Sequence, residues 1–423
     1  MGIVEKAVNT LVNNHHIMVE ISLCSRFRTP KSDCSLCADV CPANAIEISD
    51  RGAEIKEGCI DCGVCYSACP SGALRIKGRD DHKIIGEIKD TLKRKLEDEK
   101  IKRDEERNFT ISQPLNFSIS CNHGVAKADL VLSCLSRLTE VLLLEPVRMG
   151  ISGIEILRPS CDDCPSAKAS PQLEKVIQQT RYLYELIGLR NVLHVTRCAF
   201  SPLRPGTQIL ASAGTEPKIL SRRELFKSLG VKAAGIAADS IPAIEQKDKG
   251  NGEVFREAIQ NRPENLKRTL LSESIKGFVS ENPPSPPFSK GGKGGFEVPS
   301  KDALLAELEV TSGCTGCGVC ATLCPTGAII QKITEDRFYL YFRPDLCTNC
   351  EVCVKTCMPH AVNIKEKVLL NLILEQGERR IFEAGKKKCL VCRLDFIGSS
   401  DNICPLCINN HKKQMATIQS LIK

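Results

Sequence analysis

The sequence is poor in large aromatic rings. It has no tryptophan, five tyrosines and 13 phenylalanines among 423 residues, so no domain is expected to build its core on large rings. It also lacks a run of about 18 apolar residues, the length that a membrane-spanning helix needs. Its N-terminal segment has no basic region followed by a continuous apolar region, as a secretory signal would. These absences predict a cytoplasmic protein with no integral membrane segment.

Signatures of nucleotide binding and of hydrolytic catalysis are also missing. No G-x-G-x-x-G follows a strand-like segment and no P-loop is present. The seven histidines include no pair at metal-ligand spacing beyond the adjacent His15 and His16. Catalytic residues therefore stay unassigned at this stage.

Cysteine, by contrast, is abundant, with 25 residues. Disulfide-rich scaffolds are short secreted chains, whereas this chain is long and carries no export signal. A long, cysteine-rich chain of this kind points to metal or redox chemistry.

The cysteines fall into repeated motifs. Residues 59–70 (CIDCGVCYSACP) and 314–325 (CTGCGVCATLCP) read C-x2-C-x2-C-x3-C-P. Residues 347–359 (CTNCEVCVKTCMP) repeat this spacing with one residue inserted before the proline, and residues 34–42 (CSLCADVCP) contain its last three cysteines. Three cysteines at this spacing wrap around one face of a 4Fe–4S cube, and the fourth lies too far along the chain to join them.

Four such repeats in two pairs resemble two bacterial-type 2(4Fe–4S) ferredoxin domains, over roughly residues 24–78 and 308–366. The crossed ligation of that family implies four 4Fe–4S clusters. The ligand sets that the resemblance implies are Cys59, Cys62, Cys65 and Cys41; Cys34, Cys37 and Cys69; Cys314, Cys317, Cys320 and Cys357; and Cys347, Cys350, Cys353 and Cys324.

The second of these sets is one ligand short, because Lys31 stands where the first cysteine of its motif is expected. Cys24 is the only cysteine upstream of Cys34, and a looped segment could return it to the cube as the fourth ligand. The alternative is a cluster with three cysteine ligands, either 3Fe–4S or a cubane with one open iron.

A different cysteine pattern occupies the C-terminal region. Residues 389–407 (CLVCRLDFIGSSDNICPLC) form two C-x2-C knuckles separated by 11 residues, which suits a four-sulfur structural zinc site. The segment resembles a zinc ribbon, and its Cys-Pro-x-Cys half resembles a rubredoxin knuckle, so a mononuclear iron is the alternative. The lysines at 386–388 are interpreted as a solvated turn and do not predict a nucleic-acid partner. The expected ligands are Cys389, Cys392, Cys404 and Cys407.

Between the paired motifs, residues 115–200 alternate strand-like and helix-like segments, which predicts a small parallel α/β sheet. Five cysteines follow its predicted strands, at the edge where open α/β sheets bind ligands. We expect a further site there, either a 2Fe–2S cluster, a metal ion or a dithiol; the alternative is ordinary buried cysteine. The arrangement resembles the iron–sulfur subunit that links hydrogenase to heterodisulfide reductase. The expected site residues are Cys121, Cys134, Cys161 and Cys164, with Cys198 as a further candidate.

The predicted fold class is α+β multidomain, with two ferredoxin-like dicluster domains flanking a small α/β domain and a zinc-ribbon-like C-terminal knuckle. The internal SRRELFK segment resembles a twin-arginine signal but is interpreted as part of an amphipathic helix, since over two hundred residues precede it. The expected divisions are a dicluster domain at 1–80, a charged, solvated helical linker at 81–108, the α/β domain at 109–205, a linker with a disordered Pro/Gly segment at 206–300, a second dicluster domain at 301–368 and the knuckle module at 369–423.

These motifs predict an iron–sulfur protein that relays low-potential electrons as a component of an anaerobic oxidoreductase system. The partners expected are redox proteins or oxidoreductase subunits of hydrogenase, formate dehydrogenase or heterodisulfide-reductase-like type. Two alternatives are a redox enzyme with substrate or disulfide chemistry at the middle cysteines and a redox-sensing scaffold. The formal charge of +7 is largely balanced by the negative charge of four thiolate-bound clusters, and so gives no support to a nucleic-acid partner.

Overall fold

A computed structural model describes most of the chain. The described residues are 16–105, 115–124, 127–162, 164–200, 251–281, 297–374, 377–398, 402–405, 407–408 and 410. Contacts divide the chain into two compact units, Met1–Pro202 with Ile259–Lys423, and Leu203–Ala258. The SRRELFK segment and the Pro/Gly-rich linker lie outside the described residues. Among the helices described, none combines the length and apolar character needed to cross a bilayer.

The N-terminal dicluster domain consists of two antiparallel strand pairs and short helices around the cysteine loops. Strand β1 (Ile17–Val19) pairs with β4 (Leu74–Ile76), and β2 (Ile46–Ser49) pairs with β3 (Gly52–Ile55). The pair β2 and β3 spans the gap between Cys41 and Cys59, whereas β1 and β4 lie before and after the cysteine loops. The accompanying helices are α2 (Ser25–Arg28), α3 (Leu36–Asp39) and α4 (Val64–Ala68).

The C-terminal dicluster domain repeats this plan and extends it. Strand β10 (Leu308–Val310) pairs with β13 (Val362–Ile364). The second pair, β11 (Ile329–Ile333) and β12 (Arg337–Phe342), continues into a sheet of order β11-β12-β15-β16. The other elements are α11 (Val319–Leu323), α12 (Val352–Lys355), β15 (Arg379–Lys388), β16 (Asp395–Ile397) and the added pair β9 (Glu297–Pro299) with β14 (Lys367–Leu369).

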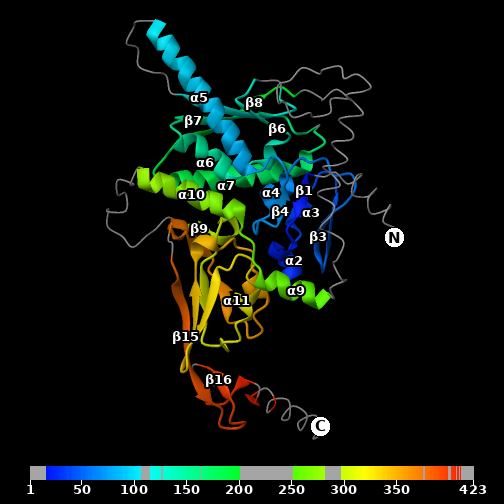
Figure 1. Ribbon diagram of the computed structural model, residues 1–423, viewed down its shortest axis with the longest axis vertical. Helices are drawn as coiled ribbons and strands as arrows, with labels where there is room; N and C mark the ends of the chain where they lie inside the picture. Colours follow the sequence, from blue (N-terminus) through cyan, green and yellow to red (C-terminus); the bar gives the residue numbers. More distant parts are fainter. Residues whose placement is uncertain are drawn as a thin grey trace, which may run out of the picture. The chain divides into compact units, whose positions relative to one another are not determined.

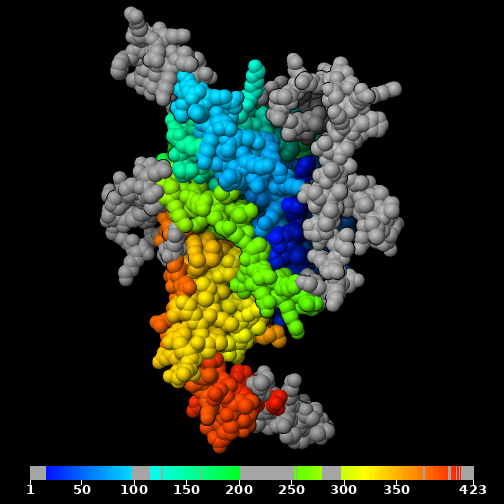
Figure 2. Space-filling view, in the orientation of Figure 1, coloured from blue at the N-terminus to red at the C-terminus, as the bar shows by residue number. Residues whose placement is uncertain are grey.

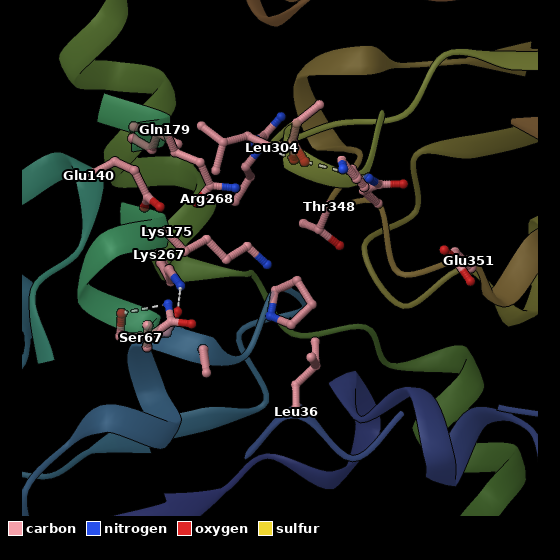
Figure 3. A pocket seen from close by; sticks show the side chains of 17 residues that line it. Leu36, Ser67, Glu140, Lys175, Gln179, Lys267, Arg268, Leu304, Thr348 and Glu351 are labelled. Carbon is pink, nitrogen blue, oxygen red and sulfur yellow. Dashed lines mark hydrogen bonds between the residues drawn. The ribbon is translucent and has the colours of Figure 1, made fainter. Parts of the chain in front are cut away.

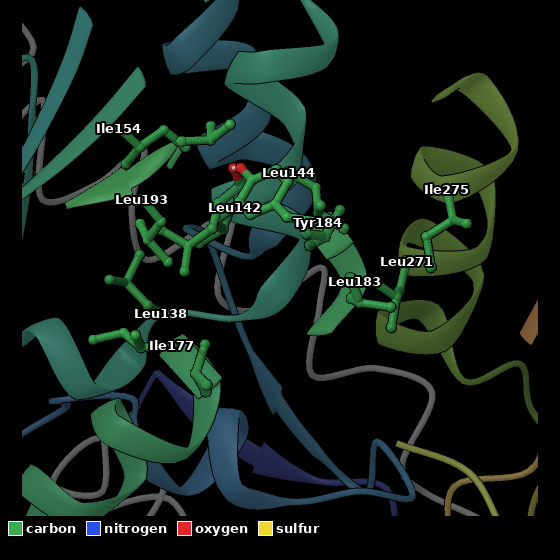
Figure 4. Close-up of a cluster of buried hydrophobic side chains, with 14 of the residues drawn as sticks. Leu138, Leu142, Leu144, Ile154, Ile177, Leu183, Tyr184, Leu193, Leu271 and Ile275 are labelled. Atoms are coloured by element: carbon green, nitrogen blue, oxygen red, sulfur yellow. Dashed lines mark hydrogen bonds between the residues drawn. The ribbon is translucent and has the colours of Figure 1, made fainter. Parts of the chain in front are cut away.

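The middle of the chain forms a four-stranded parallel sheet of order β6-β5-β7-β8 (Figure 1). Its largely aliphatic core includes Leu142, Ile154 and Ile177 (Figure 4). The buried Tyr184, which is labelled in the same view, donates a hydrogen bond to the Leu143 carbonyl. The elements are β5 (Asn116–Cys121), β6 (Leu130–Leu132), α6 (Glu140–Arg148), β7 (Gly153–Pro159), α7 (Ser170–Leu186) and β8 (Leu193–Cys198).

Two helices join this core in ways that the sequence analysis did not anticipate. Helix α5 (Asp81–Glu105), expected as a solvated linker, buries Ile84, Ile88 and Leu92 because these apolar residues recur on one face of its first turns. Helix α10 (Leu266–Glu281) packs on α6 and shares its core with the base of the C-terminal dicluster domain, which it touches in Figure 2. The two dicluster domains and the sheet are thus parts of one compact unit.

Candidate metal centres

Three of the cysteine loops share a distinctive backbone. Each contains two residues in the left-handed region, with φ between +48° and +75°. Such residues turn successive N–H groups towards one side, where they can donate to cluster sulfurs. The loop at 31–37 contains none, and its Ser35 has a φ of −131°. The left-handed residues are Asp61 and Gly63, Gly316 and Gly318, and Asn349 and Glu351.

A cavity in the C-terminal dicluster domain is surrounded by one predicted ligand set. Cys324, Cys347, Cys350 and Cys353 all line it. Burial raises the pKa of Cys353 well above its usual value, and the neighbouring thiolates of the other three add to the effect. Four thiols converging on an apolar cradle suit a 4Fe–4S cube. The apolar wall includes Ala306, Leu308, Ile329, Phe342 and Ile364.

The second set in this domain also comes together. Burial raises the pKa of Cys320 to about 12, with further contributions from the thiolates of Cys314, Cys317 and Cys357. The amide of Ala361 donates to the Cys357 sulfur over 3.2 Å. Hydrogen bonds of this kind stabilise the anionic form of a ligand sulfur and tune the potential of a cluster.

The N-terminal domain brings together the corresponding set. Burial raises the pKa of Cys65, and the thiolates of Cys62, Cys59 and Cys41 lie close enough to raise it further. The Ala45 amide donates to the Cys41 sulfur over 3.3 Å, and this bond matches the one in the C-terminal domain, since each amide lies four residues after its cysteine.

Cys24 lies beside the remaining three cysteines of this domain. It is buried at the start of α2, with its sulfur 3.5 Å from where a β-carbon on Gly52 would stand. Burial is the main cause that raises the pKa of Cys37, and the neighbouring thiolates of Cys69, Cys24 and Cys34 raise it further. The structure therefore groups Cys24 with the incomplete set, in a loop whose backbone departs from the other three.

The two dicluster domains meet through charged residues close to their cysteines. Lys355 forms an ion pair with Asp33 and lowers the pKa of Cys34, although burial has the larger, opposite effect. The Lys31 ammonium lies 3.0 Å from the Met358 sulfur. The lysine in place of a cysteine is thus part of the junction between domains.

Arg28 is a buried cation near this junction. Its guanidinium donates to the Ser22 carbonyl over 2.6 Å. Burial and the charge of Arg262 lower its pKa to about 10, while the Cys324 thiolate opposes that change. A buried cation of the N-terminal domain therefore lies near a cysteine of the C-terminal domain.

The four middle cysteines surround a small cavity at the carboxyl edge of the parallel sheet. Cys121, Cys134, Cys161 and Cys164 all line it. Burial raises the pKa of Cys121 to about 11, with the other three thiolates adding to the effect. Cys198 does not line this cavity; it ends β8, with its sulfur 3.5 Å from where a β-carbon on the neighbouring Gly124 would stand.

The middle site lies directly against one N-terminal loop. The Ser133 hydroxyl donates to the Cys62 carbonyl over 3.4 Å. Burial raises the pKa of Cys62 to about 11, and the Cys134 thiolate is among the smaller causes. A β-carbon on Gly63 would lie 2.5 Å from the Arg137 side chain, so glycine is needed for this close approach.

The C-terminal knuckles form a compact four-sulfur site. The sulfurs of Cys389, Cys392, Cys404 and Cys407 all lie within 4.8 Å of one another. The Cys392 and Cys404 sulfurs are 3.7 Å apart, close to the roughly 3.8 Å that a tetrahedral zinc–thiolate site requires. Backbone amides, with that of Cys404 at 3.2 Å, lower the pKa of Cys389 to about 6, although desolvation opposes them. The donor set fits a single tetrahedral metal ion.

The lysines preceding these knuckles belong to a strand rather than to the expected solvated turn. Lys386, Lys387 and Lys388 end β15 and pair antiparallel with Ile397, Phe396 and Asp395 of β16. Because β15 is also hydrogen-bonded to β12, the knuckles are attached to the sheet of the dicluster domain.

Sequence reasoning missed the residues at the junctions. Asp33, Lys355 and Arg137 carry no motif, and only the tertiary fold brings them to the cysteines. Of the residues at the junctions, Lys31 is the one that the sequence could have indicated, because it stands where a cysteine ligand is expected.

Comparison with known proteins identifies the class. Two family models, each described as a 4Fe–4S dicluster domain, match residues 32–74 and residues 313–361. The chain therefore carries two dicluster ferredoxin domains, with an electron-transfer role, and each match contains the cysteine loops described above.

Two curated relatives are similar to part of the chain. An uncharacterized ferredoxin of Methanocaldococcus jannaschii is 36% identical over 52 residues, which are 12% of this chain and 68% of the relative. A protein of Proteus vulgaris, named as a probable iron–sulfur subunit of the Frd operon, is 29% identical over 73 residues, 17% of this chain and 44% of that relative. The chain thus belongs to the ferredoxin family with 4Fe–4S dicluster domains, and it spans less than half of the Proteus relative.

Proposed function

We propose that the chain relays low-potential electrons along a continuous series of metal sites. The observation that carries this proposal is the junction between the dicluster domains, where Lys355 lies near Cys34 and Arg28 lies near Cys324. Ligand thiols of two different domains thus approach the same small group of cations. Electron transfer between the domains would be direct, without a mobile carrier.

Contacts between thiols of neighbouring sets extend the series. The Cys37 thiolate is among the charges that raise the pKa of Cys65 in the N-terminal domain, and the Cys320 thiolate is among those that raise the pKa of Cys353 in the C-terminal domain. The resulting order of ligand sets is the middle site; the set of Cys41, Cys59, Cys62 and Cys65; the set of Cys24, Cys34, Cys37 and Cys69; the set of Cys324, Cys347, Cys350 and Cys353; and the set of Cys314, Cys317, Cys320 and Cys357.

In this account Cys24 is the fourth ligand of the junction cluster. Its burial beside Cys34, Cys37 and Cys69 supports full cysteine coordination. When bound, each cube accepts or donates one electron, and the thiol groups and amides of this chain hold it and set its potential. The C-terminal knuckles would hold structural zinc, which fixes the end of β15 beside the adjacent ligand loop, where Ile397 packs against Gly316.

A second function belongs to the middle cysteines. Their cavity, their shared sheet edge and the approach of Cys134 to Cys62 support a redox site fed by the N-terminal cluster. It would hold a 2Fe–2S cluster or another metal, or would act as a dithiol. We infer that a catalytic partner would bind at this site. The similarity of this chain to the Proteus protein, which is named as a probable iron–sulfur subunit, supports a partner of oxidoreductase type.

Electron paramagnetic resonance of the reduced, anaerobically purified chain tests the relay. Because reduced clusters at adjoining positions interact magnetically, we expect a broadened spectrum. In Cys353→Ser the spectrum should simplify, and the signals of the N-terminal clusters should sharpen as well. A sum of independent cluster signals, with the N-terminal ones unaltered by Cys353→Ser, would contradict a continuous series.

A further inference from the structure

A cavity of about 270 Å³ lies where the two dicluster domains and the α/β domain meet (Figure 3). Ser67, Ala68 and Pro70 from the loop of Cys69 form one wall, and Thr348 and Asn349 from the loop of Cys347 form another. A cavity of this size has room for a small solute.

The charges around the cavity are mostly positive. Lys175 extends from α7 towards Thr348 in Figure 3. Within the described part of the chain, neither Lys175 nor Lys301 has a carboxylate or a hydrogen-bond acceptor as partner. The charged residues that line the cavity are Lys175, Lys267, Arg268, Lys301, Glu140 and Glu351.

The other cations are held in place by backbone carbonyls. Lys267 donates to the Ser67 carbonyl and lies 3.5 Å from that of Cys69. Arg268 donates to the Asp345 carbonyl over 2.7 Å. These bonds orient the cations and leave the charge of Lys267 without a carboxylate partner among the described residues.

The two carboxylates do not balance the free lysines. Glu351 pairs with Lys355 at 3.2 Å. Glu140 is buried, and with Cys347 and Asp345 it is one of the negative charges that oppose the burial-induced lowering of the Arg268 pKa. Lys175 and Lys301, with Lys267 behind them, remain as an uncompensated positive group. Such a group attracts small anions with two or more charges.

We propose that this cavity binds a small polyanion, either a di- or tricarboxylate or a pyrophosphate-like group, between Lys175 and Lys301. Both classes share the closely spaced negative oxygens that two ammonium groups recognise. Neither ferredoxin motif contributes these lysines, which lie on α7 and just after β9.

The position of the cavity gives the ligand a regulatory effect on the relay, a consequence that rests on the proposed function. Thr348 lines the cavity and stands between two cysteines of one ligand set, directly after Cys347 and two residues before Cys350. Ser67 and Pro70 flank Cys69 on the opposite wall. A bound polyanion places negative charge beside the two ligand loops that meet at the junction. Reduction adds further negative charge to a cluster, so the anion would lower the potentials of both junction clusters.

Titration calorimetry of the full, cluster-loaded chain with citrate and with pyrophosphate tests the binding. We expect Lys175→Met/Lys301→Met to weaken binding of the preferred probe by at least about tenfold. Lys276→Met, which removes an exposed lysine of α10 outside the cavity, should leave affinity unchanged. The bound probe should also shift the EPR-monitored potentials downwards in wild type and not in the double variant.

Each outcome is decisive for the cavity. Binding of citrate alone or of pyrophosphate alone identifies the class of anion and supports the proposal. Absence of binding by both, equal affinity in the double variant, or equal weakening in Lys276→Met would overturn it. The magnetic interaction between clusters is measured without either probe, so failure of the cavity proposal would leave the relay standing.

Discussion

Arg137 and Asp81 form a buried ion pair that joins the α/β domain to the segment leaving the N-terminal dicluster domain. Their nearest nitrogen and oxygen are 2.7 Å apart, and their side chains are only 4% and 0% exposed. Asp81 also accepts hydrogen bonds from Tyr66 and Thr139, at 3.0 and 2.8 Å. The pair therefore fixes the position of Arg137 against Gly63, and with it the approach of the middle cysteines to the cluster loop.

Arg137→Met should strongly destabilise the chain, because it leaves the Asp81 carboxylate buried without its counter-charge. We expect a loss of about 3–5 kcal/mol, measured as a lower midpoint of anaerobic guanidinium unfolding. Arg79→Met is the matched control, since Arg79 forms an exposed pair with Glu87 at 2.7 Å and its loss should cost less than about 1 kcal/mol. Equal midpoints for the two variants would refute the structural role of the buried pair.

Cys24→Ser should damage one cluster and leave the others intact. We expect the iron content to fall by about one to four atoms for each chain, depending on whether a 3Fe–4S cluster survives. Cys198→Ser, outside every proposed ligand set, should not alter it. Iron analysis and EPR of both variants provide the measurement, and an unchanged cluster content in Cys24→Ser would exclude Cys24 as a ligand.

Cys134→Ser should remove the chemistry of the middle site without removing a cubane. The four cysteines around that cavity should lose their metal or their reversible thiol oxidation, whereas sulfide attributable to the cubanes should persist. Metal analysis and thiol titration compare this variant with Cys198→Ser. Identical metal and thiol behaviour in Cys134→Ser and the wild type would contradict a site at this sheet edge.

Lys355→Met should make the cluster of Cys34 harder to reduce. Lys355 pairs with Asp33 and favours the thiolate of Cys34, so its loss removes a cation that stabilises the more negative, reduced cluster. EPR-monitored redox titration should show a lower midpoint potential, with a smaller difference at high salt because the pair is partly exposed. Lys365→Met, which breaks the pair with Glu307 at 2.6 Å, is the control; a matching shift there would argue against a specific effect at the junction.

Cys392→Ser should release the C-terminal metal while the iron of the clusters is retained. The knuckles contribute only four sulfurs within 4.8 Å of one another and share none with the cubane sets. Zinc and iron analysis distinguish the two metals. Loss of a red, iron-dependent chromophore in the variant would indicate that the knuckles hold a rubredoxin-type iron rather than zinc. Loss of cubane iron together with the C-terminal metal would show that the knuckles are not an independent site.

The sequence was most informative where spacing alone determines geometry. The C-x2-C-x2-C loops and the two C-terminal knuckles prescribe which thiols can converge. The grouping of Cys24 with Cys34, Cys37 and Cys69 was instead expected because Cys24 is the only cysteine upstream of the incomplete motif. The strands that precede the middle cysteines likewise coincide with the strand-like segments expected between residues 115 and 200.

Contacts between domains could not be derived in this way. Asp33 and Lys355 are separated by 322 positions, and nothing in either local sequence indicates a pairing. Helix α10 has a buried face formed by Leu271, Ile275 and Phe278, but its surroundings in the sequence resembled a linker. The polyanion cavity likewise depends on contacts between distant segments, since α10 contributes one wall and the loop after Cys347 another.

The most direct test of the relay is the count of iron, acid-labile sulfide and zinc in the wild-type chain purified without oxygen. Four cubanes predict about 16 iron and about 16 sulfide for each chain, with any iron of the middle site in addition. The account also predicts about one zinc, from the C-terminal knuckles. Fewer than about 12 iron in fully loaded protein would leave a gap in the series and contradict a continuous relay.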